Sequence, residues 1–287
     1  MRKDISIQVS IENPCIQQLS PFIMKISTVS CKSALTPSQL GGYDYALNPY
    51  RGCQHGCIYC YAPYVLHEKR SWGEFVEARD NLPRLLSKEL RRKAKGVVGI
   101  STVTDAYQPA EKRFEITRLA LEQLQRYDFP VCIQTKSSLV LRDLDLLQGF
   151  SKCEVGFTVT TLDEDIRQKI EPGASTVGER LAALETLADA GVSTWAFLGP
   201  ILPSITDGED DLRSLISALK KTGVSYLIVD RLNFKQGMRP DFIDFIAREF
   251  PEQLNIYRQP LKGSFDTAKK EVTRFCRDAD LKVEFCY

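Results

Sequence analysis

The sequence predicts an α/β fold in which parallel β-strands alternate with α-helices. Three observations support this prediction. Six short apolar runs are spaced along residues 43–264, apolar residues recur at helical spacing between them, and polar motifs directly follow several of the runs. Short strands that are apolar throughout are typical of a parallel sheet covered on both faces.

The predicted strands are Tyr45–Asn48, Val97–Thr102, Val131–Thr135, Cys153–Val159, Thr194–Leu198 and Tyr226–Asp230. The clearest helical patterns lie between them, with apolar faces at Ile116, Ala120, Leu124 and Tyr127, at Leu181, Leu184 and Ala188, and at Leu212, Leu215, Ile216 and Leu219. This periodicity leaves a doubly wound sheet and a barrel both open. Either fold binds its ligands beyond the carboxyl ends of the strands.

Two extensions flank the predicted core domain, which covers residues 43–264. Residues 1–42 form an N-terminal arm with a weak strand signal at Phe22–Val29. Residues 265–287 form a short C-terminal extension, with a helix at Asp266–Arg277 and a strand at Leu281–Tyr287, which we expect to pack on the core.

Charge and composition narrow the class of protein. The chain has 38 Lys and Arg residues against 37 Asp and Glu residues, so DNA is a conceivable partner that the charge does not indicate. The sequence has no secretory signal and no apolar run of membrane-spanning length, which predicts a soluble cytoplasmic enzyme without a membrane partner. In that compartment the nine cysteines are expected to be thiols or metal ligands.

Three cysteines share one short loop. Cys53, Cys57 and Cys60 have the spacing C-x3-C-x2-C, with glycines at positions 52 and 56. A cubane iron–sulfur cluster takes one ligand per iron, so three thiolates leave one iron open to another molecule. A zinc site that adds His55 is chemically allowed, but this residue lies inside the first spacer and would close a tetrahedron with difficulty.

Four other cysteines could form a second metal site, but their lack of close spacing favours scattered thiols. They are Cys15, Cys31, Cys276 and Cys286.

The cysteine loop resembles that of radical S-adenosylmethionine (SAM) enzymes, and more narrowly the branch with spore photoproduct lyase and DNA repair photolyase-like proteins. The resemblance runs from about residue 33 to about residue 233 and is carried by the segments 48–62, 102–109, 134–137, 156–161 and 171–174. It implies a partial (β/α)6 TIM-like barrel of radical SAM type. It also implies a 4Fe-4S cluster, SAM as cofactor, and a low-potential electron donor of the ferredoxin or flavodoxin type.

The resemblance also implies roles for residues at the rim of the sheet. Cys53, Cys57 and Cys60 would bind the cluster, and the Lys136 ammonium would bind the SAM carboxylate. The remaining SAM contacts would come from Tyr59 and Tyr61 beside the last cysteine, and from the hydroxyls of Thr104 and Thr160. Asp105 and Tyr107 are candidate catalytic residues.

These features predict an enzyme that cleaves SAM to a 5′-deoxyadenosyl radical, which abstracts hydrogen from an unidentified substrate. Repair of a DNA photolesion is an alternative within the same class. However, Val103 stands where the lyase has a cysteine hydrogen donor, which makes the lyase's own route doubtful. The other alternative is a zinc-bound binding module without enzymatic activity.

Overall fold

The computed structural model describes residues 24–261 and 263–287. It contains an eight-stranded sheet in the order β11-β10-β9-β8-β7-β6-β3-β2 and a three-stranded sheet in the order β1-β5-β4. All neighbours from β3 to β11 in the larger sheet are parallel, whereas β2 is antiparallel to β3. The strands are β1 (Lys25–Val29), β2 (Thr36–Pro37), β3 (Tyr45–Leu47), β4 (Tyr50–Arg51), β5 (Phe75–Arg79), β6 (Val98–Ile100), β7 (Val131–Thr135), β8 (Cys153–Thr158), β9 (Ser193–Ile201), β10 (Tyr226–Arg231) and β11 (Lys282–Phe285).

Helices connect most of these strands. The α-helices are α1 (Ala62–Val65), α2 (Leu82–Leu90), α3 (Glu111–Phe114), α4 (Ile116–Arg126), α5 (Leu144–Leu147), α6 (Glu164–Ile170), α7 (Val177–Asp189), α8 (Glu209–Lys221), α9 (Met238–Glu249), α10 (Leu254–Arg258) and α11 (Asp266–Asp278). Two short 3₁₀-helices cover Ser138–Asp143 and Pro251–Gln253. No helix in these two described ranges is long and apolar enough to cross a membrane.

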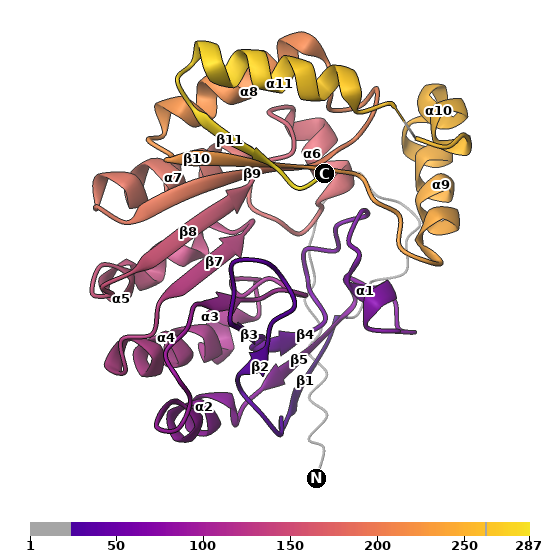
Figure 1. Cartoon of the computed structure of the whole chain (residues 1–287). Coiled ribbons are helices and arrows are strands. Elements are labelled where there is room, and N and C mark those ends of the chain that lie inside the picture. The colour runs from indigo at the N-terminus through magenta and orange to yellow at the C-terminus, as the bar shows by residue number, and fades with distance from the viewer. Residues whose placement is uncertain (1–23, 262) are drawn as a thin grey trace, which may run out of the picture.

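The predicted α/β fold class and all six predicted strands are confirmed. From β6 to β11, neighbours in the sheet follow one another along the chain. The strand order therefore does not reverse, as it would in a doubly wound sheet. Figure 1 shows the sheet curving, with α2, α4, α5, α7, α8 and α11 along its outer side, an arrangement consistent with the predicted partial barrel.

The two faces of the curved sheet differ in burial. Ile133, Val155, Phe157 and Ala196 belong to one face and are fully buried. The opposite face carries more polar side chains that are only partly buried, such as Gln134 and Glu154. The apolar core therefore lies between the sheet and its layer of helices.

Two helices show how the local sequence sets this layer. The apolar residues predicted for the helix that forms α8 are all buried, and α11 packs beside this helix while β11 pairs with β10. Helix α7 begins with a capping box, in which the Thr176 hydroxyl accepts from the Glu179 amide and the Glu179 carboxylate accepts from the Thr176 amide. Residues 266–285 thus extend both the sheet and the helix layer.

The smaller sheet lies against the start of the cysteine loop. Its strand β4 ends at Arg51, directly before this loop, and β5 pairs with both β4 and β1. The Glu68 carboxylate, which is 5% exposed, forms ion pairs with Arg51 at 2.9 Å and Arg70 at 2.8 Å. The weak strand signal predicted at residues 22–29 corresponds to β1, although its first two residues, like Cys15, lie outside the described residues.

Candidate functional site

The three cysteines lie in a loop between β4 and α1, at the carboxyl-end rim of the large sheet. All three are free thiols; Cys53 is buried and the other two are half-buried. Gly52 has a φ of +80°, and a Cβ at this position would lie 2.3 Å from the Phe75 carbonyl oxygen. Only glycine fits here, because the backbone is left-handed and passes directly over β5.

The segment that follows β6 holds the first half of this loop. The Gln108 side chain is fully buried, donates to the Gly52 carbonyl at 3.2 Å and accepts from the Gln54 amide at 2.9 Å. In return, the Gln54 side chain accepts from the Ala110 amide at 2.5 Å. The loop and the segment after β6 are therefore joined by side-chain-to-backbone bonds that fix their relative position.

The end of α6 and the segment that follows it hold the other side of the cysteine loop. The Gly173 amide donates to the His55 carbonyl at 3.0 Å, and the Ile58 amide donates to the Ile170 carbonyl at 3.0 Å. A Cβ at Gly173 would lie 2.1 Å from the Gln54 carbonyl oxygen. This close approach of two backbones explains the glycine.

Asp105 joins three segments of the rim. Its carboxylate is buried and accepts from the Thr135 hydroxyl at 2.7 Å and from the Lys136 amide at 2.8 Å. It also accepts from the Tyr107 amide at 2.9 Å and lies 3.3 Å from Nδ1 of His55. Burial works against its charge, but His55 and the other donors outweigh burial and hold the pKa of Asp105 well below its usual range.

A buried ion pair lies beneath the cysteine loop. Glu171 and Arg180 are both fully buried and 2.5 Å apart. Glu171 also accepts from the hydroxyls of Tyr59 and Thr160, the latter at 3.0 Å. Burial opposes the charge on Glu171, yet Arg180 and Lys136 lower the pKa of this carboxyl, so it is ionised at neutral pH.

Lys136 extends from the end of β7 toward this ion pair. Its ammonium nitrogen lies 5.7 Å from the centre of the Tyr59 ring. Burial works against the ammonium charge, while Cys57, Glu171 and Asp105 together raise the pKa of Lys136. Because the Cys57 thiol is itself protonated at neutral pH, we attribute this effect to the two carboxylates.

The remaining predicted residues lie farther along the rim or away from it. Tyr61 is 40% exposed and donates to the Thr102 carbonyl at 2.7 Å, and the Thr104 hydroxyl lies 3.5 Å from that of Ser101. Tyr107 is fully buried, and the nearby carboxylates of Asp143 and Glu111 add to the effect of burial in raising its pKa. The structure thus gathers the cysteines, Tyr59, Asp105, Lys136 and Thr160, with Tyr61 and Thr104 beside them.

The donor set fits an iron–sulfur cluster better than a single zinc ion. Burial raises the pKa of all three thiols, that of Cys57 to about 12, so a bound metal has to displace their protons. Within residues 24–261 and 263–287, no three His, Cys, Asp or Glu side chains surround one metal position. In a cluster each thiolate binds a different iron, whereas a zinc ion needs all its ligands around one centre. Moreover, Nδ1 of His55 already faces Asp105.

Sequence reasoning missed the residues that support this loop. Glu171 lies in a segment that carries the family resemblance, but no local pattern shows that it is buried or that Arg180 on α7 is its partner. Gln54 and Gln108 were missed for the same reason, since polar side chains are usually exposed. The only sequence signal for these supporting residues was the charge of Glu171 within a segment that carries the family resemblance.

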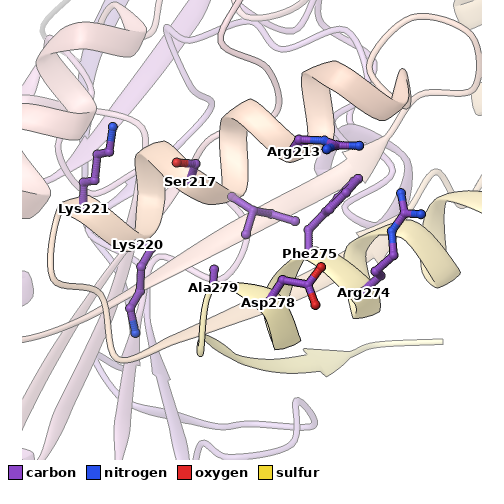
Figure 2. Close-up of a pocket in the computed structure, with 9 residues that line it drawn as sticks. Arg213, Ser217, Lys220, Lys221, Arg274, Phe275, Asp278 and Ala279 are labelled. Carbon is purple, nitrogen blue, oxygen red and sulfur yellow. The ribbon is translucent and has the colours of Figure 1, made fainter.

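A separate groove of about 640 Å³ lies on the outer side of the fold, between α8 and α11 (Figure 2). Arg213, Lys220, Lys221 and Arg274 line it, and none of the predicted site residues does. Both arginines pair with the single Glu209 carboxylate. The groove is separate from the site at the rim.

Comparisons with known proteins bear on the family and the fold of this chain. The family model described as the radical SAM superfamily matches residues 47–216, a range that includes all three cysteines. A protein from Methanocaldococcus jannaschii, named Uncharacterized protein MJ0683, is 32% identical over 263 residues, which cover 91% of this chain and 96% of the relative. The Radical SAM Nalpha-GlyT isomerase of Pseudomonas phage M6 is 25% identical over 73% of this chain and 44% of the phage protein.

Solved structures show the same fold. Spore photoproduct lyase complexed with dinucleoside spore photoproduct superposes with a TM-score of 0.69 at 17% identity, over 91% of this chain and 82% of the lyase. Streptococcus suis SuiB bound to its precursor peptide SuiA superposes with a TM-score of 0.56 at 11% identity, over 84% of this chain and 47% of SuiB. At these identities the likeness concerns the fold alone.

Proposed function

The chain belongs to the radical SAM superfamily, and we propose that it is an enzyme that abstracts hydrogen from a substrate by radical chemistry. The observation that carries this proposal is the trio of free thiols at the carboxyl-end rim of a parallel sheet. A 4Fe-4S cluster bound there would supply an electron that splits bound SAM into methionine and a 5′-deoxyadenosyl radical. The physiological electron would come from a low-potential donor such as a ferredoxin or flavodoxin.

Each residue of the site has a proposed role in binding the cluster or SAM. Cys53, Cys57 and Cys60 would each bind one iron as a thiolate. Lys136 supplies a positive charge that two carboxylates stabilise next to the loop, and we propose that it binds the SAM carboxylate. Tyr61 and Thr104 remain proposed SAM contacts from the rim. Tyr59 and Thr160 would contact SAM from positions that their bonds to Glu171 fix.

Anaerobic reconstitution tests this function directly. The purified protein is loaded with iron and sulfide, reduced with dithionite and supplied with SAM, and 5′-deoxyadenosine is measured by liquid chromatography. We expect a brown protein that forms 5′-deoxyadenosine, and a Cys57→Ala variant that does not. A wild-type protein that forms no more product than this variant contradicts the proposal.

A Lys136→Gln variant separates binding of SAM from binding of the cluster. Removal of one charged contact to a carboxylate typically costs about 2 kcal/mol, which corresponds to a roughly 30-fold weaker affinity for SAM. Iron content should stay at the wild-type level. Equal SAM affinity in the two proteins would exclude Lys136 as the partner of the carboxylate.

Repair of a DNA lesion is a second candidate within the same reaction class. It is supported by the fold shared with spore photoproduct lyase. Val103, at the position where the lyase has a cysteine hydrogen donor, argues against the same route of repair. Binding to a fluorescent DNA duplex with a photolesion tests this candidate, since contacts to phosphates weaken steeply with salt. A protein that binds no DNA at low salt lacks this function.

A further inference from the structure

Asp105 is a buried carboxylate with a complete set of donors. The two oxygens of its carboxylate accept from Thr135, from the amides of Tyr107 and Lys136, and face Nδ1 of His55. The side chain is 8% exposed, and His55 is 2% exposed. Both oxygens are occupied by groups of the protein itself, so this carboxylate acts from a fixed position.

The same carboxylate lies close to the cluster loop. His55 belongs to the loop, two residues after Cys53, and meets the carboxylate at 3.3 Å. No water or ion has to bridge these groups.

We propose that Asp105 is a positioning residue whose negative charge, held beside the cluster loop and partly offset by His55, lowers the reduction potential of the cluster. The inference rests on the proposed function, because it requires that the loop binds a redox-active cluster.

Electrostatics sets the direction of this effect. Reduction adds one negative charge to the cluster, and a nearby fixed negative charge makes that addition less favourable. Hydrogen bonds and charges around the ligands are among the protein's main means of tuning such potentials. Burial strengthens the interaction, because little water is present to screen it. The His55 ring, with Nδ1 3.3 Å from the carboxylate, works in the opposite direction, since it offsets part of the negative charge.

The experiment measures the midpoint potential of reconstituted protein by redox titration monitored with electron paramagnetic resonance. Asp105→Asn removes the charge and keeps the shape, so the midpoint should rise. His55→Phe removes the offsetting group. Titrated at alkaline pH, where the carboxylate stays ionised without His55, this variant should have a lower midpoint than wild type. Thr135→Val is the matched control, because it removes a hydrogen bond from the same carboxylate without removing its charge. This control should show no rise.

The outcomes separate this inference from the proposed function. A wild-type protein that assembles no cluster fails the proposed function itself. If wild type and Asp105→Asn carry equal iron and sulfide and share one midpoint, the inference is wrong although the function stands. An Asp105→Asn protein that folds normally but binds no cluster also overturns it, because loss of charge alone should not prevent assembly. Where Asp105→Asn does not fold, His55→Phe decides: a lower midpoint supports the inference, and an equal or higher one overturns it.

Discussion

Replacing Glu171 by Gln should strongly destabilise the protein, because it leaves the charge of Arg180 buried without its partner. Both side chains are fully buried. The guanidinium also donates to the Thr158 carbonyl at 3.0 Å and to the Ser175 carbonyl at 2.9 Å, so it cannot swing out into water. Breaking one side of such a pair costs about 3–5 kcal/mol.

Urea denaturation of the cluster-free protein, followed by circular dichroism, measures this cost as a change in the free energy of unfolding. We expect Glu171→Gln to lose about 3–4 kcal/mol. An exposed ion pair serves as the control. Glu209 and Arg213 lie 2.9 Å apart but are 52% and 58% exposed, and Glu209→Gln should change stability by at most about 0.5 kcal/mol.

A double-mutant cycle with Glu171→Met and Arg180→Met tests whether the two charges act as a pair. Apolar replacement of both partners removes the uncompensated charge, so the double variant should be more stable than the sum of the single losses by about 2 kcal/mol or more. A Glu171→Gln variant within about 1 kcal/mol of wild type would refute this reasoning. It would mean that Arg180 finds a compensating partner when Glu171 loses its charge.

Three further measurements test separate parts of the structure. The hydrogen bond from Arg70 to the Glu68 carboxylate lowers the pKa of Glu68 from its usual 4.5 to about 2. Because solvent screens the two exposed arginines, the ionised Glu68 should contribute about 1–2 kcal/mol to the free energy of unfolding. This contribution should be present above pH 4.5 and be lost as the pH falls toward 2. A Glu68→Gln variant with the same acid dependence as wild type would exclude this source. Gly173→Ala should lower the free energy of unfolding in urea by about 2–3 kcal/mol, because the new Cβ would meet a backbone oxygen. The control Gly178→Ala places its Cβ in open space and should be neutral or slightly stabilising. Equal effects of the two substitutions would contradict the close approach at Gly173. Thr176→Ala removes the cap of α7 and should lower the free energy of unfolding by about 1 kcal/mol, and an unchanged value would show that the capping box contributes nothing.

The six strands predicted for the core domain, β3 and β6 to β10, could be predicted because their signal is local. Each is a short, mostly apolar run, which is typical of strands in a parallel sheet. Strand β5 escaped prediction for the opposite reason. Its segment, Phe75–Arg79, mixes apolar and charged residues, and it forms a strand through pairing with β1 and β4. The register between β1 and β5 joins residues 50 positions apart, and no local pattern specifies such a contact.

In the site, too, local features could be predicted and long-range contacts could not. The spacing of Cys53, Cys57 and Cys60 is local, and it sufficed to predict the loop. The contacts that shape the loop come from residues 105–110 and 170–173, which only the folded sheet brings together. The role of Lys136 was predicted through the family resemblance, but the carboxylates that stabilise its charge were not predicted.

These long-range contacts bear on how the loop would bind the proposed cluster. In small zinc modules, metal binding supplies the free energy of folding, because the ligands have no fixed positions beforehand. Here Gln108 and Gly173 hold the loop from two sides through contacts that involve no metal. The free energy of cluster binding therefore does not have to order the loop backbone, which is the general advantage of a preorganised site. What it must overcome is the displacement of protons from three buried thiols. If the proposed cluster binds here, the free energy that positions the loop comes from folding and not from metal binding, and the buried pair of Glu171 and Arg180 is part of that folded structure.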